Sequence, residues 1–200
     1  PHHRQSRPPR IFTIEEVRAI LNEAANLPDH HLMQFRGLTF RMYFLTLYTL
    51  GLRASEALGL QLGDIDFVQS CMTIVHTKFY KGRVLPFGPR FGTVLSLYID
   101  THPMLRGGDR NTYLFPPASH RTPHLDRSCS FNTLQGIVKK LGFKTPPDIQ
   151  PPCLHSFRHS FAVYWMERWL REGADIEVKL PLLTAFLGHW EVSSTQVYLT

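Results

Sequence analysis

The sequence has 200 residues, of which 43% are hydrophobic and 19% are charged, so it resembles an ordinary folded domain and is not a disordered, collagenous or coiled-coil chain. Lys and Arg total 22 against 16 Asp and Glu, and the formal charge of +6 favours a polyanionic partner such as nucleic acid. The most apolar stretch, 43–52, is about half as long as a membrane-spanning helix, and no secretory leader is recognisable.

Residues 1–12 are rich in Arg and Pro, which predicts a solvated basic arm or linker ahead of one folded domain, 13–200. The arginines of this arm, Arg4, Arg7 and Arg10, are candidate contacts for a polyanion. We expect the arm to lie outside the packed core.

The first half of the domain has a helical pattern. A capping box at Thr13–Glu16, followed by apolar residues at helical spacing, predicts a helix that ends near Ala25. A second helix is expected over 35–50 and ends at Gly51. A third is expected over 54–62, where a Gly-Asp pair breaks the pattern.

A small sheet follows these helices. Residues 72–76 and 83–87 are rich in strand-forming side chains and are expected to pair as a hairpin joined by 77–82. Helical spacing returns over 91–99. The polar segment 101–122 contains Gly and Pro and is expected to be a long exposed loop.

The last third of the chain is again helical, which makes the fold class mostly α with a small antiparallel β-sheet (α+β). In chain order we expect a helix over 130–141, an extended proline-rich segment over 144–152, a helix over 155–170, a short helix with Pro181 in its first turn and Leu187 at its end, and a final helix capped by Ser193 or Ser194.

Three cysteines, Cys71, Cys129 and Cys153, lie far apart and form no C-x-x-C pair. An odd number of isolated cysteines is typical of a reducing compartment. We therefore expect all three to be structural and the protein to be cytoplasmic.

Two arginines occupy apolar surroundings. Arg53 lies between two apolar helical segments, and Arg158 lies within the run LHSFRHSFA. An arginine removed from water needs an acceptor, and its planar guanidinium matches two non-bridging phosphate oxygens. An internal carboxylate satisfies it equally well, and Glu56, one helical turn after Arg53, is the candidate. Both interpretations remain open from the residues alone.

Two histidines, His155 and His159, share a helix face with Arg158. Their i, i+4 spacing is also that of a zinc-binding pair, with His189 or Cys153 as a third ligand. The glutamate that a zinc hydrolase carries next to its first histidine is absent from HSFRH. We therefore expect no metal, and we expect His159 to have a structural role.

Tyr198 lies nine residues after His189. A lone tyrosine is more often an aromatic residue of a core or an interface. Two arginines, two histidines and a tyrosine, however, are what phosphoryl transfer to a phenol requires: cations for the phosphate, proton carriers and an acceptor.

The blocks GLRASEALGL, LHSFRHSFA and LGHWEVSSTQVY resemble those of the tyrosine recombinase, or phage-type integrase, family from about Thr13 to Thr200. The resemblance implies the catalytic-domain fold of that family. It places five residues on the family's catalytic positions: Arg53, His155, Arg158, His189 and Tyr198. His159 matches an accompanying residue, and Glu56 is expected to hold Arg53 in place.

The sixth family position is a lysine in the turn of a β-hairpin. The segment HTKFYKGRVLPFG has the hairpin without the usual Gly-Lys-Gly turn, and counting back from the 83–86 strand selects Lys78 as the general acid. Lys81 matches a further basic position. Lys81 and Arg83 are expected to contact DNA.

The resemblance implies a site-specific recombinase that cuts and rejoins double-stranded DNA through a 3′-phosphotyrosyl bond, with no metal, ATP or other cofactor and no small-molecule substrate. The full-length protein is expected to act as a homo-oligomer, a tetramer, on DNA in the nucleoid. The N-terminal DNA-binding domain and C-terminal docking segment of relatives are expected to be absent from this sequence. A type IB topoisomerase-like enzyme and an inactive DNA-binding module are the alternatives.

Overall fold

The computed structural model describes residues 7–75, 82–117 and 122–188. The first helix, α1 (Ile14–Ala25), begins at the predicted capping box: the Thr13 hydroxyl accepts from the Glu16 amide at 3.1 Å, and the Glu16 carboxylate accepts from the Thr13 amide at 3.0 Å. This reciprocal pair satisfies two amides that helix geometry leaves without partners. The predicted start and end of α1 are confirmed.

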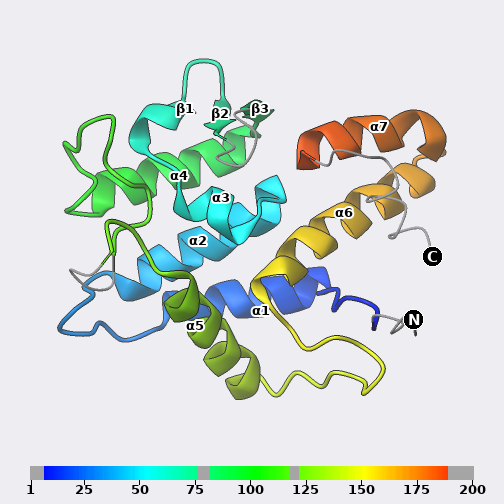
Figure 1. Ribbon diagram of the computed structural model, residues 1–200, viewed down its shortest axis with the longest axis horizontal. Helices are drawn as coiled ribbons and strands as arrows, with labels where there is room; N and C mark the ends of the chain where they lie inside the picture. The colour runs from blue at the N-terminus through cyan, green and yellow to red at the C-terminus, as the bar shows by residue number, and fades with distance from the viewer. Residues whose placement is uncertain (1–6, 76–81, 118–121, 189–200) are drawn as a thin grey trace, which may run out of the picture.

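Helix α2 (Arg36–Leu50) runs through the middle of the molecule and packs against α1 on one side and α6 on another (Figure 1). It is buried around its circumference, with Phe40, Tyr43, Phe44 and Leu47 all fully inaccessible. A helix that is apolar on every face belongs at the centre of a core. The predicted helix over 35–50 is therefore confirmed.

Helix α3 (Ala54–Leu58) is shorter than the predicted 54–62. Leu60, which continues the apolar pattern, leaves the helix and packs into the core, where it is 2% exposed. A short 3₁₀ turn, Leu62–Asp64, follows. The apolar spacing was therefore compatible with a helix that the chain ends at Gly59.

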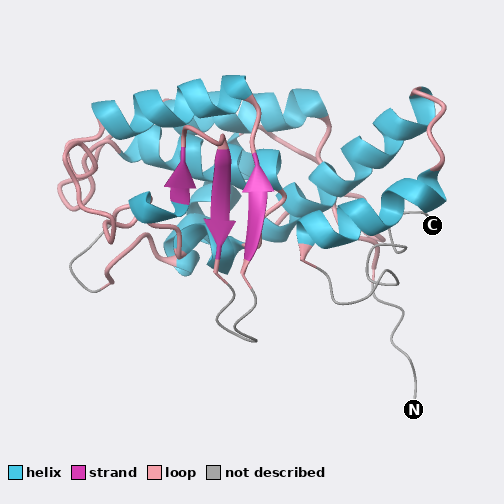
Figure 2. Ribbon diagram, turned by 90° about the horizontal axis from the view of Figure 1, so that it is seen from above, coloured by secondary structure: helices cyan, strands magenta, loops and turns pink. Residues whose placement is uncertain are grey.

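Three short antiparallel strands lie side by side in the order β1-β2-β3 (Figure 2). They are β1 (Ile65–Asp66), β2 (Cys71–Ile74) and β3 (Arg83–Pro86). In the register of β2 and β3, Met72 lies opposite Leu85. The predicted hairpin is confirmed with shorter strands, whereas β1 was not predicted because two residues carry no periodic signal.

Helices α4 (Pro89–Thr101) and α5 (Arg127–Lys140) both begin before their predicted starts. Pro89 opens α4 because proline tolerates the first turn, where its missing amide is not needed. Asp126 caps α5 by accepting from the Cys129 amide at 2.9 Å. The cap residue, and not the first apolar residue, therefore sets each boundary. No helix lies within the described part of the segment between them.

Helices α6 (Leu154–Arg171) and α7 (Ile176–Leu187) form a helical pair beside the main body (Figure 1). The prediction that Pro181 lies in the first turn of a short helix is wrong. Asp175 caps α7 by accepting from the Glu177 amide at 2.9 Å, so the helix begins earlier and contains Pro181. The last predicted helix, capped by Ser193 or Ser194, lies outside the described residues.

The described part of the predicted arm, 7–12, packs against the domain. Phe12 is 4% exposed, its amide donates to the Ser160 hydroxyl at 2.7 Å, and the Pro8 carbonyl accepts from Gln150. An apolar anchor at the end of a basic segment thus overrides the solvated arm that composition suggested. The proline-rich segment 144–152 is also more than an extended strand, because it contains a turn near Pro146.

Two further observations concern the chain as a whole. The three cysteines are all free thiols that are half-buried. Among the helices of the described ranges, none is both long and apolar enough to cross a membrane.

Candidate functional site

The junction between α2 and α3 positions the first pair of the site. Arg53 is the residue before α3, and the Glu56 carboxylate reaches back one turn to accept from the Arg53 amide at 2.9 Å. Its other oxygen accepts from Arg53 Nη1 at 2.8 Å. One glutamate therefore caps the helix and holds the arginine side chain, so the internal partner weighed for Arg53 is present. The Arg53 side chain is still 33% exposed, which leaves it an open side.

Arg158 lies inside the molecule on α6 and is fully buried. Its Nη1 donates to the Gly51 carbonyl at 2.9 Å, and its Nη2 donates to the Leu187 carbonyl at 2.7 Å. Glu56 is 3.9 Å from Nη1. These carbonyls stand at the ends of α2 and α7, where helix geometry leaves acceptors without donors and concentrates partial negative charge. The buried cation thus joins two helix ends and one carboxylate.

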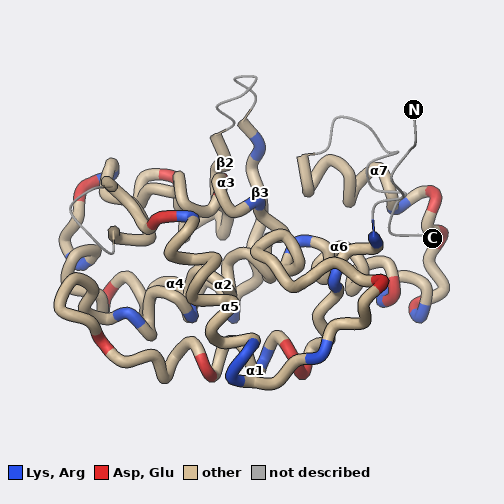
Figure 3. The backbone as a smooth tube through the Cα atoms, turned by 60° about the horizontal axis from the view of Figure 1, so that its bottom comes forward, with Lys and Arg blue, Asp and Glu red and all other residues tan. Residues whose placement is uncertain are grey.

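Arg83 is the third arginine of the cluster. It begins β3, at the base of the hairpin, where Figure 3 marks a basic position beside the undescribed turn. Its Nη1 and Nη2 donate to the two Glu56 oxygens at 3.1 and 3.0 Å, and its Nε donates to the Phe186 carbonyl at 2.8 Å. The side chain is 12% exposed. The expectation that it contacts DNA did not foresee these internal partners.

The C-terminus of α7 is held by all three arginines. Arg53 Nη2 donates to the Gly188 carbonyl at 3.3 Å. Three successive carbonyls therefore accept from three different arginines, in the pairs Phe186–Arg83, Leu187–Arg158 and Gly188–Arg53. Since the predicted His189 follows directly, this contact fixes the point from which the last part of the chain departs.

Two glycines make this close arrangement possible. Gly51 ends α2 and Gly188 ends α7, both with left-handed backbone, at φ of 58° and 66°. A Cβ on Gly51 would fall 2.6 Å from the Phe161 ring, and a Cβ on Gly188 would fall 2.8 Å from Arg83 Nη1. Glycine is the residue that accepts both the conformation and the lack of space.

The charges of the cluster favour an anion. Burial alone would raise the pKa of Glu56, but hydrogen bonds and positive charge from Arg83 and Arg53 outweigh this and lower it to about 2. At neutral pH the carboxylate is ionised and faces three guanidinium groups. The cluster therefore keeps an excess of positive charge, which suits the binding of a phosphate.

His155 stands on the first turn of α6 and forms an edge-to-face contact with His159, with 4.6 Å between ring centroids. The residue is exposed on one side, yet desolvation of its ring and the positive charges of Arg158 and Arg53 lower its pKa to about 4. His155 is therefore neutral at neutral pH and able to accept a proton. Within the described ranges, no three potential metal ligands cluster together.

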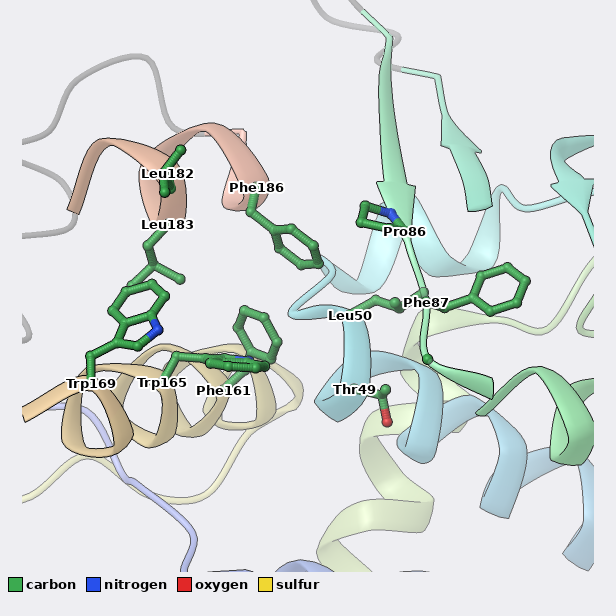
Figure 4. Close-up of a pocket in the computed structure, with 11 residues that line it drawn as sticks. Thr49, Leu50, Pro86, Phe87, Phe161, Trp165, Trp169, Leu182, Leu183 and Phe186 are labelled. Carbon is green, nitrogen blue, oxygen red and sulfur yellow. The ribbon is translucent and has the colours of Figure 1, made fainter. Parts of the chain in front are cut away.

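An apolar pocket of about 530 Å³ lies next to the arginine cluster (Figure 4). Aromatic side chains of α6 and α7, including Phe161, Trp165, Trp169 and Phe186, line much of it together with Pro86 of β3. No ionisable side chain lines it. The pocket therefore lacks the groups that proton or phosphoryl transfer needs, and the chemistry belongs to the arginine cluster.

Residues 10–200 match the phage integrase family, which covers nearly the whole chain. The chain belongs to the phage integrase family. The curated relatives it resembles include a putative integrase/recombinase, y4rB, of Sinorhizobium fredii, which is 32% identical over 96% of this chain and 61% of the relative. Tyrosine recombinase XerA of Pyrococcus horikoshii is 32% identical over 95% of this chain and 56% of its own length. This integrase-family chain thus spans about three fifths of these relatives.

Solved structures agree with the family fold. A crystal structure of XerA recombinase matches all of this chain and 62% of its own, with a TM-score of 0.67 and 25% identity. The Tn1549 transposon integrase matches 98% of this chain and 63% of its own, with a TM-score of 0.71 and 17% identity. The predicted family and its mostly α fold with a small antiparallel sheet are confirmed.

The structure brings together those predicted catalytic residues of this integrase-family chain that it describes: Arg53, His155 and Arg158, with Glu56 between the arginines. The other predicted site residues, Arg4, Lys78, Lys81, His189 and Tyr198, lie outside the described residues. Arg7 is exposed. Arg10 pairs with Glu16, which draws this predicted DNA contact toward the body of the protein.

We expect Glu56→Gln to lower the free energy of unfolding by on the order of 3 kcal/mol, because it removes the one carboxylate that the three arginines share. The contribution of Glu56 is present above its ordinary pKa of 4.5 and is lost as the pH falls toward 2, so the two proteins should converge in acid. Urea unfolding across pH measures the difference.

Glu172→Gln is the matched control for this substitution. Glu172 pairs with Arg168 at 2.8 Å, but both side chains are about half exposed. Such a surface pair contributes about 0–1 kcal/mol. A loss for Glu56→Gln no larger than that of the control would mean that the carboxylate does not hold the cluster together.

Proposed function

We propose that this chain is the strand-cutting and strand-joining part of a site-specific DNA recombinase. The observation that supports this most is the shared Glu56 with Arg53, Arg83 and Arg158 around the end of α7, directly before the predicted His189. The phenolic oxygen of Tyr198 attacks a DNA phosphorus, the bond to the 5′ oxygen breaks, and a 3′-phosphotyrosyl bond and a free 5′-hydroxyl remain. The reverse step rejoins DNA to a different strand.

The arginines serve the phosphate in this proposal. Arg53 has an open side and donates to the non-bridging oxygens, while Arg158 lies beneath and adds positive charge without contact with solvent. Both act where negative charge grows in the transition state, which is the most effective place for fixed charges. Glu56 keeps Arg53 in position, and His189 donates a further hydrogen bond to the phosphate.

Two proton transfers complete the reaction. His155 is neutral because its pKa is held near 4, so it takes the proton from Tyr198, whose free hydroxyl is ionised only to about 0.1% at neutral pH. Lys78 gives a proton to the departing 5′ oxygen. Both protons are therefore accounted for by residues of this chain, and the energy of the broken bond is kept in the phosphotyrosine for rejoining.

The partner in this proposal is double-stranded DNA, with the full-length protein acting as a homo-oligomer on the nucleoid. The XerH recombinase, whose structure was solved with its difH substrate, shares this fold at a TM-score of 0.69. The relatives above are named as recombinases or integrases, which favours recombination over the topoisomerase alternative. The predicted catalytic set argues against an inactive DNA-binding module.

Covalent capture tests this function. A nicked duplex with a randomised central region is mixed with the protein, and the DNA that stays bound on a denaturing gel is sequenced to give a defined substrate. We expect an adduct that forms equally well with EDTA, because arginines supply the positive charge that a metal would otherwise provide. Absence of any adduct, or an adduct that requires added Zn²⁺ or Mg²⁺, would contradict the proposed mechanism.

A further inference from the structure

Arg83 connects three parts of the site that are far apart in the sequence. It is the first residue of β3, directly after the hairpin turn; it shares Glu56 with Arg53; and it holds the end of α7. We infer that Arg83 is a positioning residue of the recombination reaction, which acts through Glu56 and the α7 end. This inference rests on the proposed function of the site.

The contact with Glu56 is bidentate. Both guanidinium nitrogens of Arg83 reach the two carboxylate oxygens, at 3.1 and 3.0 Å, and this geometry fixes the plane of the carboxylate as well as its distance. The same carboxylate holds the amide and the side chain of Arg53. A change at Arg83 therefore reaches Arg53, which touches the phosphate in the proposed reaction, without any direct contact with DNA.

The contact with α7 is equally specific. Nε of Arg83 donates to the Phe186 carbonyl at 2.8 Å, and Nη1 lies where a Cβ on Gly188 would be. The Arg83 side chain thus lies against the last turn of α7, one residue before His189. It sets the distance between this helix end and the strand that carries the hairpin.

An internal role also fits the accessibility of Arg83. Its side chain is 12% exposed, whereas that of Arg53 is 33% exposed. A phosphate contact by Arg83 would require it to give up a buried ion pair, and a Glu56 carboxylate that loses a partner is costly. Lysine is a poor substitute, because one ammonium group has no planar fork for the carboxylate with a third donor for the carbonyl.

The experiment compares Arg83→Gln and Arg83→Lys with the parent protein, using the substrate defined by covalent capture. Arg41→Gln is the matched control, since Arg41 is exposed on α2 and its loss removes the same charge. Duplex affinity is measured over a salt series, and the rate of adduct formation is measured at saturating DNA. Circular dichroism establishes that each variant is folded at the assay temperature, and Arg83→Lys carries the test if Arg83→Gln is unfolded.

We expect Arg83→Gln to form adduct about 10²-fold more slowly at saturating DNA, because misplacement of reacting groups by about 1 Å has effects of this size. Arg83→Lys should remain clearly slower than the parent, and Arg41→Gln should equal it. The salt slope of duplex binding should be the same for Arg83→Gln and Arg41→Gln. In a Glu56→Gln background, Arg83→Gln should slow the reaction much less, because residues that act through one another are not additive.

Two results would overturn the inference. One is an unchanged adduct rate at saturating DNA together with a salt slope that is shallower by about 0.9 than that of Arg41→Gln, which would make Arg83 a phosphate contact. The other is equal slowing by Arg83→Gln with and without Glu56. A parent protein that forms no adduct would instead count against the proposed function on which the inference rests.

Discussion

Tyr198→Phe should abolish the covalent adduct and all strand cleavage while duplex affinity stays nearly the same. The substitution deletes the hydroxyl that we propose as the nucleophile, and phenylalanine has no group that can replace it. No charge is lost, so the electrostatic part of DNA binding, which dominates affinity, is retained. A denaturing gel measures the adduct, and a mobility shift at fixed salt measures binding.

Tyr164→Phe is the matched control. Tyr164 lies on α6 and is only half-buried, and our mechanism gives it no part in the reaction. The control should form adduct at the parent rate. Adduct that persists in Tyr198→Phe and disappears in Tyr164→Phe would show that the nucleophile is assigned to the wrong residue.

Lys78→Ala should slow cleavage of ordinary DNA by about 10²–10⁴-fold, which is the typical contribution of a general acid. The departing 5′ alkoxide is a strong base and leaves slowly without a proton. If sulfur replaces the 5′-bridging oxygen, the leaving thiolate has a pKa near that of a cysteine thiol, about 8.5, and needs no proton. We therefore expect Lys78→Ala to cleave the sulfur substrate almost as fast as the parent.

The same substrate separates acid catalysis from charge neutralisation. Arg53→Ala should not be rescued by sulfur, because its guanidinium serves oxygens that the replacement leaves in place. Rescue of Lys81→Ala in place of Lys78→Ala would move the general acid by three residues along the hairpin. Rescue of neither lysine variant would contradict a lysine acid, and His155 would be the next residue to test.

Local signals predicted the parts of the fold that depend on neighbouring residues. The capping box at Thr13 fixed the start of α1, and the apolar run before Gly51 defined α2. The start of α7 was missed because Pro181 was taken as a first-turn residue. The Asp175 cap is the stronger signal, and a proline within a helix costs one hydrogen bond that the surrounding packing can offset.

The candidate site divides in the same way. The pair of Arg53 and Glu56 is one helical turn long, so its spacing in the sequence was sufficient to suggest it. The contact between Arg83 and Glu56 spans 27 residues, and the contact between Arg83 and Phe186 spans 103. No local pattern encodes such contacts. A basic residue at the start of a strand therefore looked like a DNA contact until the tertiary structure placed it beside a buried carboxylate.

The central claim is that Tyr198 becomes covalently joined to the 3′ phosphate of the cleaved strand, and peptide mapping of the adduct tests it directly. Protein trapped on the defined nicked duplex is digested, and the peptide attached to DNA is sequenced by mass spectrometry while the ends of the cleaved strand are analysed. We expect a phosphotyrosine at Tyr198 linked to the 3′ end, with a free 5′-hydroxyl on the other fragment. Attachment through another residue, or through a 5′ phosphate, would contradict the mechanism.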